Sequence, residues 1–436
     1  MKVQVPAAFR LLYAKRQQVI KPGLERILEG CACLGDLQNS VPGVVIGGTN
    51  GKGSTAGMLW RLYAAHGEKV GLFSSPHLES FAERIQITDA KVDEPLIEQE
   101  LFHLQQLLPP SLYEEMSFFE LTTLLALKIF RDAGCVLNIL EVGLGGRLDC
   151  TNIGSPLATA IISVGMDHTA LLGDTPALIA REKCGILRPG APLLWGGRTS
   201  GTAEADQVVR SEAARVGAPL LEAGVDFSWE DIAQSAPDLV RSAPEYLRHN
   251  FALAVAIMRE TQIRRGYSPV EADAQVERAL ARYDQPSLPW PPTLVGRFSE
   301  MLVDLKAPGA RPQPLLFDVC HNVDGAVVFV RALRERFGQD VRLPGLVSMM
   351  KDKDTAGIIA VLKGVLSPLV LFRNENERSV PCDDDFDAVW RQARERFPVR
   401  ADAPWVVCGS VMAVGEVLAY FREHGFLQNS TSFRQG

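Results

Sequence analysis

The segment at residues 44–55 is the part of the chain best suited to binding phosphate, and it reads Val-Val-Ile-Gly-Gly-Thr-Asn-Gly-Lys-Gly-Ser-Thr. An apolar strand is expected to run into a glycine-rich turn, and the turn into a helix. Gly47, Gly48, Gly51 and Gly53 permit positive φ and let backbone N–H groups approach phosphate oxygens. Lys52 adds a positive charge, and the N-terminus of the helix favours an anion. The segment therefore predicts a loop that cradles a triphosphate rather than a turn that binds nothing.

The spacing of this loop differs from the usual GxxxxGK[ST] pattern. Three residues separate Gly47 from Gly51, and Gly53 occupies the position where a magnesium-binding hydroxyl would follow the lysine. The loop is therefore interpreted as a P-loop variant. Its candidate nucleotide-binding residues are Thr49, Asn50, Gly51, Lys52, Gly53 and Ser54.

A second candidate is Glu141, which follows an apolar run. A carboxylate at the carboxyl end of a parallel strand points into the crevice where ligands bind, so Glu141 is a magnesium candidate. The alternative is an edge glutamate that faces solvent. It is the weaker interpretation, because Gly143, Gly145 and Gly146 follow and would let the backbone approach a ligand. A dinucleotide-binding interpretation of the same glycines fails on spacing, which is not GxGxxG.

Three further residues have an ordinary structural interpretation when each is taken alone. His168 follows an aspartate, and a lone histidine is usually structural or solvated. Ser75 lies in a Ser-Ser-Pro sequence that is typical of a turn. Lys183 lies near the end of a helix that Thr175 should cap and Gly185 should close, where a surface lysine is common.

The elements that must position these residues alternate along the chain. Short aliphatic runs separated by segments with helical spacing indicate a buried parallel sheet. The strands expected first are Val44–Ile46, Val70–Phe73, Val136–Val142 and Ala158–Ser163. Further along, strands are expected at Leu315–Phe317, Leu346–Ser348, Leu369–Phe372 and Trp405–Cys408. The pattern predicts an α/β fold in both halves of the chain.

A proline cluster at residues 286–292 separates the two halves, after a helix that Ser268 and Glu271 should begin with a capping box. We therefore expect two domains, residues 1–290 and 291–436. Hydrophobic residues make up 47% of the 436-residue chain and charged residues 22%, as in globular enzymes.

The charge of the chain bears on its partners. The net charge of −7 argues against a nucleic-acid partner, whose phosphates would require a basic face. The stretch Met1–Gln18 has neither the apolar region of a signal peptide nor the length of a membrane span, so a cytoplasmic location without membrane contact is expected. The eight cysteines form no CxxC pair, which argues against a zinc site.

The loop and a series of later motifs together resemble the folylpolyglutamate synthase and dihydrofolate synthase family, which is related to the Mur peptide ligases. The motifs, in chain order, are Ser-Ser-Pro-His-Leu at 74–78, Glu-Arg-Ile at 83–85, Glu-Val-Gly-Leu-Gly-Gly-Arg-Leu-Asp at 141–149, Asp-His-Thr at 167–169, Arg-Glu-Lys-Cys-Gly at 181–185, Gly-Arg-Phe at 296–298, Asp-Val-Cys-His-Asn at 318–322 and Lys-Asp-Lys-Asp at 351–354. Each motif alone is weak evidence. Their order and their spread over both halves make the match specific.

The resemblance implies a P-loop-containing N-terminal ATPase domain with a parallel-rich sheet, followed by a smaller Rossmann-like α/β domain. It also implies roles for residues. The catalytic residues would be Lys52, Lys183 and His168, and the metal ligands Ser75, Glu141, His168 and a carbamylated Lys183. The nucleotide would also contact Asn250, expected at the head of a helix from Phe251 to Arg259, together with Arg297, Asp318 and His321. The substrate would contact Phe119, Glu120, Leu121, Thr122, Leu148, Asp149 and Cys150, with Phe119 stacking on a pterin ring.

The activity implied is ATP-dependent ligation of L-glutamate to 7,8-dihydropteroate, to folates, or to both, through an acyl phosphate. ATP and two Mg²⁺ ions would be required, the partners would be small molecules, and the chain would be a monomer. One alternative is another Mur-like ligase that acts on a different carboxylate. A second is a catalytically inactive ATP-binding regulatory protein, which is suggested by Cys320 and Val323 in place of the alanine and proline usual in the family's Ala-His-Asn-Pro block.

Overall fold

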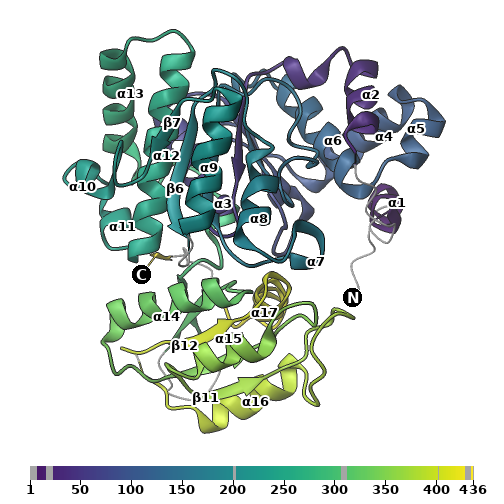
Figure 1. The fold of residues 1–436 in the computed structure, drawn as a ribbon. Coiled ribbons are helices and arrows are strands. Elements are labelled where there is room, and N and C mark those ends of the chain that lie inside the picture. The colour runs from purple at the N-terminus through teal and green to yellow at the C-terminus, as the bar shows by residue number, and fades with distance from the viewer. Residues whose placement is uncertain are drawn as a thin grey trace. The chain divides into compact units, whose positions relative to one another are not determined.

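The computed structural model describes residues 7–15, 23–199, 203–305, 312–400, 402–427 and 434–435. Of the N-terminal stretch used above, residues 1–6 and 16–18 lie outside the described residues. Backbone contacts divide the chain into two units. Figure 1 shows the chain coloured by residue number from the N-terminus to the C-terminus. The first unit comprises Met1–Ser75, Ser80–Pro237 and Asn250–Pro291, and the second Pro76–Glu79, Asp238–His249 and Pro292–Gly436.

The expected boundary at residue 290 lies beside the start of the main segment of the second unit. Two short segments that precede this boundary nevertheless belong to the second unit by their contacts. The division into domains 1–290 and 291–436 stays a prediction.

The first unit is built on a sheet of seven strands among the described residues, in the order β3-β2-β4-β1-β5-β6-β7. Its strands are β1 (Gly43–Gly47), β2 (Val70–Phe73), β3 (Ile85–Ile87), β4 (Leu137–Glu141), β5 (Ala158–Val164), β6 (Leu193–Thr199) and β7 (Leu220–Glu222). All neighbouring pairs are parallel except β2 and β3. The carboxyl ends of β2, β4, β1 and β5 therefore meet at one edge of the sheet.

The predicted strands of the first half are confirmed to within two residues at each end. Their buried aliphatic residues face helices on both sides, which is why the runs are continuous rather than alternating. The strands β3, β6 and β7 were not predicted. β6 reads Leu-Leu-Trp-Gly-Gly-Arg-Thr, and its two glycines hide the aliphatic pattern.

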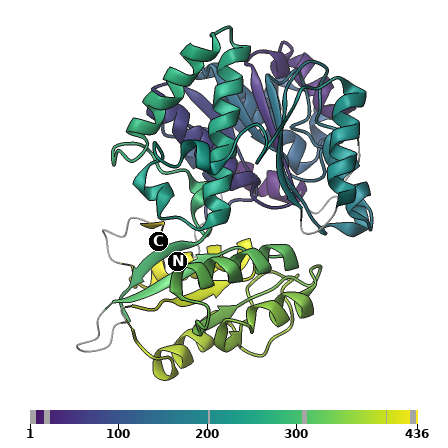
Figure 2. The same ribbon diagram turned by 60° about the vertical axis from the view of Figure 1, so that its left-hand side comes forward.

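Helices cover both faces of this sheet (Figures 1 and 2). The helices of the first unit are α1 (Ala7–Ala14), α2 (Glu25–Cys33), α3 (Lys52–His66), α4 (Glu94–Leu107), α5 (Pro110–Glu115), α6 (Phe118–Asp132), α7 (Thr169–Leu172), α8 (Pro176–Cys184), α9 (Ala203–Val216), α10 (Trp229–Ile232), α13 (Pro269–Arg282) and, from Asn250 onward, α12 (Glu245–Arg264). Helix α3 packs on α13 and lies against β1, β2 and β4, whereas α6, α8 and α9 lie against β2, β5 and β6. The predicted capping box of α13 is confirmed, with Ser268 and Glu271 bonded reciprocally.

The prediction for the helix around Asn250 was wrong at its start. The helix was expected to begin at Phe251, but α12 begins at Glu245. Asn250 is therefore an internal helical residue and not a helix cap. Pro244, which precedes the helix and favours its first turn, was the signal that could have placed the start correctly.

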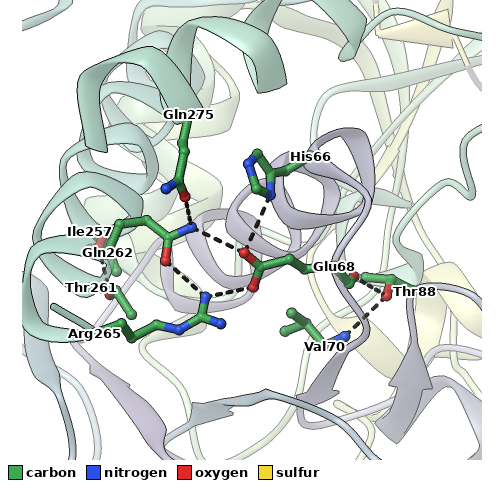
Figure 3. A network of polar contacts seen from close by, with 9 residues as sticks. All are labelled: His66, Glu68, Val70, Thr88, Ile257, Thr261, Gln262, Arg265 and Gln275. Atoms are coloured by element: carbon green, nitrogen blue, oxygen red, sulfur yellow. Dashed lines mark hydrogen bonds and ion pairs between the residues drawn. The ribbon is translucent and has the colours of Figure 1, made fainter. Parts of the chain in front are cut away.

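A buried polar network fastens the far end of α3 to α12 and α13 (Figure 3). Glu68, just past α3, accepts hydrogen bonds from Arg265 at 2.5 Å and from Gln262 at 3.2 Å, and lies 3.3 Å from the ring nitrogen of His66. Gln262 also donates to Gln275 of α13. Burial alone would raise the pKa of Glu68, but the hydrogen bonds from His66, Arg265 and Gln262 outweigh it and lower the pKa to about 2.

The second unit has a smaller sheet, with six strands among the described residues in the order β11-β10-β12-β9-β8-β13. The strands are β8 (Ser299–Val303), β9 (Gln313–Asp318), β10 (Leu343–Val347), β11 (Leu366–Leu371), β12 (Trp405–Cys408) and β13 (Arg434–Gln435). Strands β9 to β12 are parallel, and β8 and β13 are antiparallel additions at one side. The predicted strands of the second half are confirmed by β9 to β12, although their bounds shift by up to three residues.

The helices of the second unit are α11 (Asp238–Arg241), α14 (Val323–Phe337), α15 (Thr355–Leu362), α16 (Phe386–Arg396) and α17 (Val411–Glu423). Its core contains a group of packed aromatic rings that includes Trp390, Trp405 and Phe421. Within the described residues, no helix of either unit is both long and apolar enough to span a membrane.

Candidate active site

The glycine-rich loop lies between β1 and α3, at the carboxyl edge of the first sheet. Gly48 and Gly51 have φ of 143° and 85°. A Cβ at Gly48 would lie 3.2 Å from the backbone nitrogen of Ser163, and one at Gly51 would lie 2.9 Å from the Ile162 side chain. Both conformation and space therefore require glycine at these two positions.

The expectation of positive φ at the two outer glycines was wrong. Gly47 ends β1, and Gly53 lies in the first turn of α3, where regular φ values apply. Gly47 is instead a close-packing position, since a Cβ there would lie 3.3 Å from Ile186.

Residues at the end of β5 anchor the loop. The backbone N–H groups of Thr49 and Asn50 donate to the carbonyl and hydroxyl oxygens of Ser163, at 2.8 and 3.0 Å. The hydroxyl of Thr49 accepts a hydrogen bond from the backbone of Gly165 at 3.0 Å. These two amides are therefore used within the chain. The amides in the first turn of α3 have no acceptor within their own helix, as at any helix N-terminus, and such groups are suited to bind an anion.

Lys52 lies over this loop. Its ammonium group donates to the carbonyl oxygens of Gly48 and Thr49, each at 3.1 Å. The side chain of Asn250 reaches the same loop from α12, because a Cβ at Gly51 would lie 3.2 Å from both atoms of its amide. The structure thus brings together the predicted loop and the predicted asparagine, which are far apart in sequence.

Lys183, near the end of α8, is buried, with 3% of its surface exposed. The helix caps predicted for it are confirmed, with Thr175 at the start and Gly185 at the end of α8. The surface-lysine interpretation is therefore wrong for this residue. Burial, followed by the positive charge of Lys52, lowers the pKa of Lys183 to about 7, against the opposing effects of Asp167 and Asp149.

Two glycines, one in the loop after β4 and one at the end of α8, let this loop and helix pack closely. A Cβ at Gly146 would lie 2.8 Å from the carbonyl oxygen of Glu182, and one at Gly185 would lie 2.3 Å from the Arg147 side chain. The amide of Arg147 also donates to the Glu182 carbonyl at 2.9 Å. These glycines therefore allow the loop to pack against the helix that carries Lys183.

Glu141 and Ser75 meet at the carboxyl edge of the sheet. Glu141 ends β4 and is buried, and one of its carboxylate oxygens accepts the backbone N–H of Ser75 at 3.2 Å. Ser75 follows β2, the strand next to β4. Two of the four predicted metal ligands are therefore neighbours.

His168 follows β5 and caps the short helix α7. Its φ of 51° is uncommon for a residue with a side chain, and 42% of that side chain is exposed. The imidazole lies 4.0 Å from the carboxylate of Asp167. His168 thus lies at the same sheet edge as the loop, a few residues after a strand that pairs directly with β1.

The predicted substrate-binding residues separate into two groups. Leu121 and Thr122 are fully buried within α6, where their side chains pack in the interior of the unit. Glu120 is buried too, where it completes the capping box of α6 with Ser117 and pairs with Arg26. The substrate contact predicted for these three residues stays a prediction, and their burial in the core of the unit does not favour it.

Phe119 remains a candidate for substrate contact. It is partly exposed, and its ring lies beside Gly143, where a Cβ would come within 2.7 Å. Leu148 is exposed, whereas Cys150 is buried. Asp149 is buried and accepts from the amides of Leu144 and Thr151, so its carboxylate shapes the loop after β4.

The remaining candidates lie in the second unit. Asp318 ends β9, and its carboxylate accepts the backbone N–H groups of Phe298 and Cys320 at 3.0 and 2.9 Å. His321 follows, with its ring nitrogen 3.0 Å from the carbonyl oxygen of Val319. His321 is not the cap of α14, because Asn322 has that role.

Sequence reasoning missed Tyr246, whose hydroxyl donates to the Asp318 carboxylate at 3.4 Å. It lies in the first turn of α12, ahead of the helix start expected from the sequence. A prediction that started the helix at Pro244 and Glu245 would have placed Tyr246 one turn before Asn250.

Magnesium fits the donor set. Among the described residues, no three His, Cys, Asp or Glu side chains are grouped as a metal-binding set. Ser75 and the buried carboxylate of Glu141 are hard oxygen donors, and Mg²⁺ needs few such ligands because it retains waters and takes others from phosphate. The pairing of the two residues at the sheet edge is compatible with that ion.

A parallel sheet whose edge carries a glycine loop, a lysine and a helix N-terminus defines a nucleotide-binding α/β protein.

No family model matches the chain. The chain is 30% identical over 384 residues to the dihydrofolate synthase/folylpolyglutamate synthase of Haemophilus influenzae, covering 84% of this chain and 82% of that protein. The chain therefore belongs to the dihydrofolate synthase/folylpolyglutamate synthase family.

A second relative is a longer protein. The chain is 30% identical over 380 residues to a probable bifunctional folylpolyglutamate synthase/dihydropteroate synthase of Haloferax volcanii, covering 83% of this chain but 42% of that protein.

Solved structures share the fold. The chain matches E. coli FolC in complex with DHPP and ADP with a TM-score of 0.78 and 26% identity, over 97% of this chain and 99% of that one. It matches a bifunctional folylpolyglutamate synthase/dihydrofolate synthase with Mn, AMPPNP and L-glutamate bound with a TM-score of 0.75 and 29% identity, over 96% and 100% of the two chains.

Proposed function

We propose that this chain is an ATP-dependent ligase that joins the amine of L-glutamate to the carboxylate of 7,8-dihydropteroate, of a folate, or of both. The observation that carries the proposal is the position of Lys52 over the glycine loop, with the buried Lys183 close enough to be affected by its charge. Family membership and the ligands named in the solved structures of relatives support it.

The chemistry follows from the weakness of a carboxylate as an electrophile. Transfer of the γ-phosphoryl group of ATP to the substrate carboxylate gives an acyl phosphate and ADP. The glutamate amine then attacks the acyl carbon, phosphate leaves, and the amine loses a proton as the amide forms. Lys52 and the first-turn amides of α3 would stabilise the negative charge of the transferring phosphoryl group.

A divalent ion, when bound, neutralises phosphate charge and orients the transferring group. Ser75, Glu141 and His168 are the residues proposed to hold it, and Lys183 would join them as a carbamate. The lowered pKa of Lys183 supports this role, because carbamate formation needs the neutral amine. Two ions are proposed, and Asn250, Arg297, Asp318 and His321 are proposed to contact the nucleotide.

We also propose that the two domains are residues 1–290 and 291–436. The chain would act as a cytoplasmic monomer on small molecules, without a nucleic-acid partner. Phe119, with its partly exposed ring beside the loop that follows β4, is the best-supported contact for a pterin.

One assay tests the proposed reaction. ADP release is measured with dihydropteroate, with tetrahydrofolate and with a cell-wall precursor, each with and without L-glutamate. Glutamate-dependent release with either pterin substrate supports the proposal. Release only with the cell-wall precursor would favour another Mur-like ligase, and nucleotide binding without turnover on any substrate would favour a regulatory protein.

A further inference from the structure

The proline-rich segment that follows α13 belongs to the first unit. This unit continues as far as Pro291, and we call residues 283–290 the exit segment. Its prolines, at positions 286 and 289, have no N–H group and cannot hold the segment through backbone donors. Its carbonyl oxygens therefore need donors from other parts of the chain if the segment is to be fixed.

Arg61, on α3, supplies those donors. Its Nε donates to the carbonyl oxygen of Tyr283 at 3.1 Å. One terminal nitrogen donates to the carbonyl oxygens of Leu288 and Pro289, at 3.2 and 2.8 Å. The other donates to the carbonyl oxygen of Gln285 at 3.4 Å, a longer and therefore weaker bond. Four carbonyl oxygens of the exit segment thus converge on one guanidinium.

Two aromatic rings of the same segment also face this guanidinium. Its central carbon lies 5.1 Å from the ring centroid of Tyr283 and 4.9 Å from that of Trp290. Arg61 is 3% exposed, and burial lowers its pKa against the opposing effects of Tyr283 and Asp284. A buried cation is costly unless its donors are used, so Arg61 needs the exit segment as much as the segment needs Arg61.

An arginine is required for this arrangement. Its planar group presents five N–H donors in a fixed fork and can lie against aromatic faces. An ammonium group has three donors around a single point, which cannot reach carbonyl oxygens spread from Tyr283 to Pro289 in the same way.

We propose that Arg61 anchors the exit segment to α3, so that residues 283–290 move as part of the first unit and the freedom of the backbone begins only after Pro291. Most of the proline cluster expected between the domains is then a fixed strap rather than a free linker. The strap is held by the helix that begins at Lys52. The anchor is independent of the proposed reaction, because it involves residues of the first unit alone.

Hydrogen exchange of the full chain measures the anchor directly. The amides of Gln285 and Leu288 donate to the carbonyl oxygens of Arg282 and Gln285 at 3.0 and 3.1 Å, so their exchange reports opening of the exit segment. Mass spectrometry would compare peptides covering this segment in the wild type, Arg61→Met and Arg61→Lys. We expect exchange about 10- to 100-fold faster in Arg61→Met, the scale for a hydrogen bond to a charged group. Arg61→Lys should resemble Arg61→Met, because the fork is lost.

The matched control is Arg215→Met, at an arginine of α9 whose side chain is 69% exposed. It should leave exchange in the exit segment unchanged. Three results would each overturn the proposal: wild-type exchange as fast as in an unstructured peptide, unchanged exchange in Arg61→Met, or wild-type protection in Arg61→Lys.

Limited digestion with chymotrypsin distinguishes release of the exit segment from loss of the whole fold. The protease cleaves after tyrosine, and Tyr283 and Tyr113 are both buried, with 1% and 4% of their surfaces exposed. Tyr113 lies in α5, outside the exit segment. In Arg61→Met, cleavage after Tyr283 should accelerate by the same factor as exchange, and cleavage after Tyr113 should not. Equal acceleration at both sites would show that Arg61 supports the unit as a whole, which contradicts a local anchor.

A milder variant covers the case in which Arg61→Met does not fold. Trp290→Leu removes one of the two rings that face the guanidinium. It breaks no hydrogen bond of the indole, whose N–H has no partner among the described residues. Exchange in the exit segment should rise about two- to fivefold, the range for one cation–π contact near the surface. Exchange at the wild-type rate in Trp290→Leu would contradict the proposed anchor.

Discussion

Lys52 and Lys183 come from different helices, and the charge of Lys52, together with burial, lowers the pKa of Lys183 to about 7. Two neighbouring ammonium groups repel each other, and a buried one also loses its hydration. Both costs fall when an anion binds between them or when one lysine becomes neutral. The pair therefore favours a phosphate at the loop and an uncharged or modified Lys183.

Replacing Lys52 with alanine should reduce turnover by roughly 10²- to 10³-fold, the scale for losing one preorganised electrostatic group. The fold should survive, because the hydrogen bonds that the Lys52 ammonium group donates to Gly48 and Thr49 lie within its own loop. Steady-state assays measure the effect, with thermal unfolding as a check on folding. Lys91→Ala, at a lysine whose side chain is 85% exposed, is the matched control. A folded Lys52→Ala protein with near wild-type kcat would remove the loop from the active site.

Replacing Glu141 with glutamine should raise the Mg²⁺ concentration needed for half-maximal activity. The amide keeps the shape of the side chain and can still accept the Ser75 N–H, but it lacks the charge that favours a divalent ion. His168→Ala should act in the same direction. The control is His66→Gln, at the far end of α3 in the network of Figure 3. If the Mg²⁺ titration curves of Glu141→Gln and the wild type coincide, the metal has been placed at the wrong residues.

Replacing Lys183 with alanine should abolish turnover, and a short carboxylic acid should restore part of it by supplying an oxygen ligand in the vacated space. Lys183→Arg should not restore activity, because a guanidinium stays charged at neutral pH. Wild-type activity should fall as the pH drops through about 7, where the amine becomes protonated, and bicarbonate should partly reverse the loss. Undiminished activity of Lys183→Arg would return Lys183 to a purely structural role.

Nucleotide affinity should fall as the pH drops through about 6. Burial raises the pKa of Asp318 to about 6, against the opposing effects of the Phe298 amide, Arg297, the Cys320 amide and Tyr246. Below that pH the carboxyl is protonated and accepts hydrogen bonds from the Phe298 amide and from a bound nucleotide more weakly. Calorimetric titrations with ADP between pH 5 and 8 in about half-unit steps would measure the change. The step should be absent in Asp318→Asn, and its persistence there would assign the pH dependence to another group.

Glu68→Gln should destabilise the chain at neutral pH, because it removes the charged acceptor of Arg265. The folded-state pKa of about 2 lies below the ordinary value of 4.5, so this contribution to stability is present above pH 4.5 and is lost as the pH falls toward 2. The stability difference between wild type and variant should therefore shrink over that window. Urea unfolding measures it, with Glu277→Gln, at an exposed glutamate of α13, as control. A difference that does not change with pH would mean that Glu68 is not the charged partner of Arg265.

Local signals in the sequence were sufficient for several features. The apolar run before Gly48 and the glycines after it placed β1, the loop and α3 correctly, because strand patterning and turn chemistry depend on neighbouring residues. The capping residues Ser268 and Thr175 marked the starts of α13 and α8 for the same reason. The motif series also led to the family that the comparison with known proteins shows.

Features that depend on residues far apart in the chain were decided by the tertiary structure. No local pattern shows that Lys183 is buried within reach of the charge of Lys52, or that the side chain of Asn250 lies against Gly51. The resemblance implied substrate contact for Leu121 and Thr122, but only the folded structure shows that both side chains are buried in the core. The burial of a side chain, the shift of its pKa and its approach to another residue depend on which elements lie next to one another. Strand order and helix packing determine those neighbours, and both exist only in the folded chain.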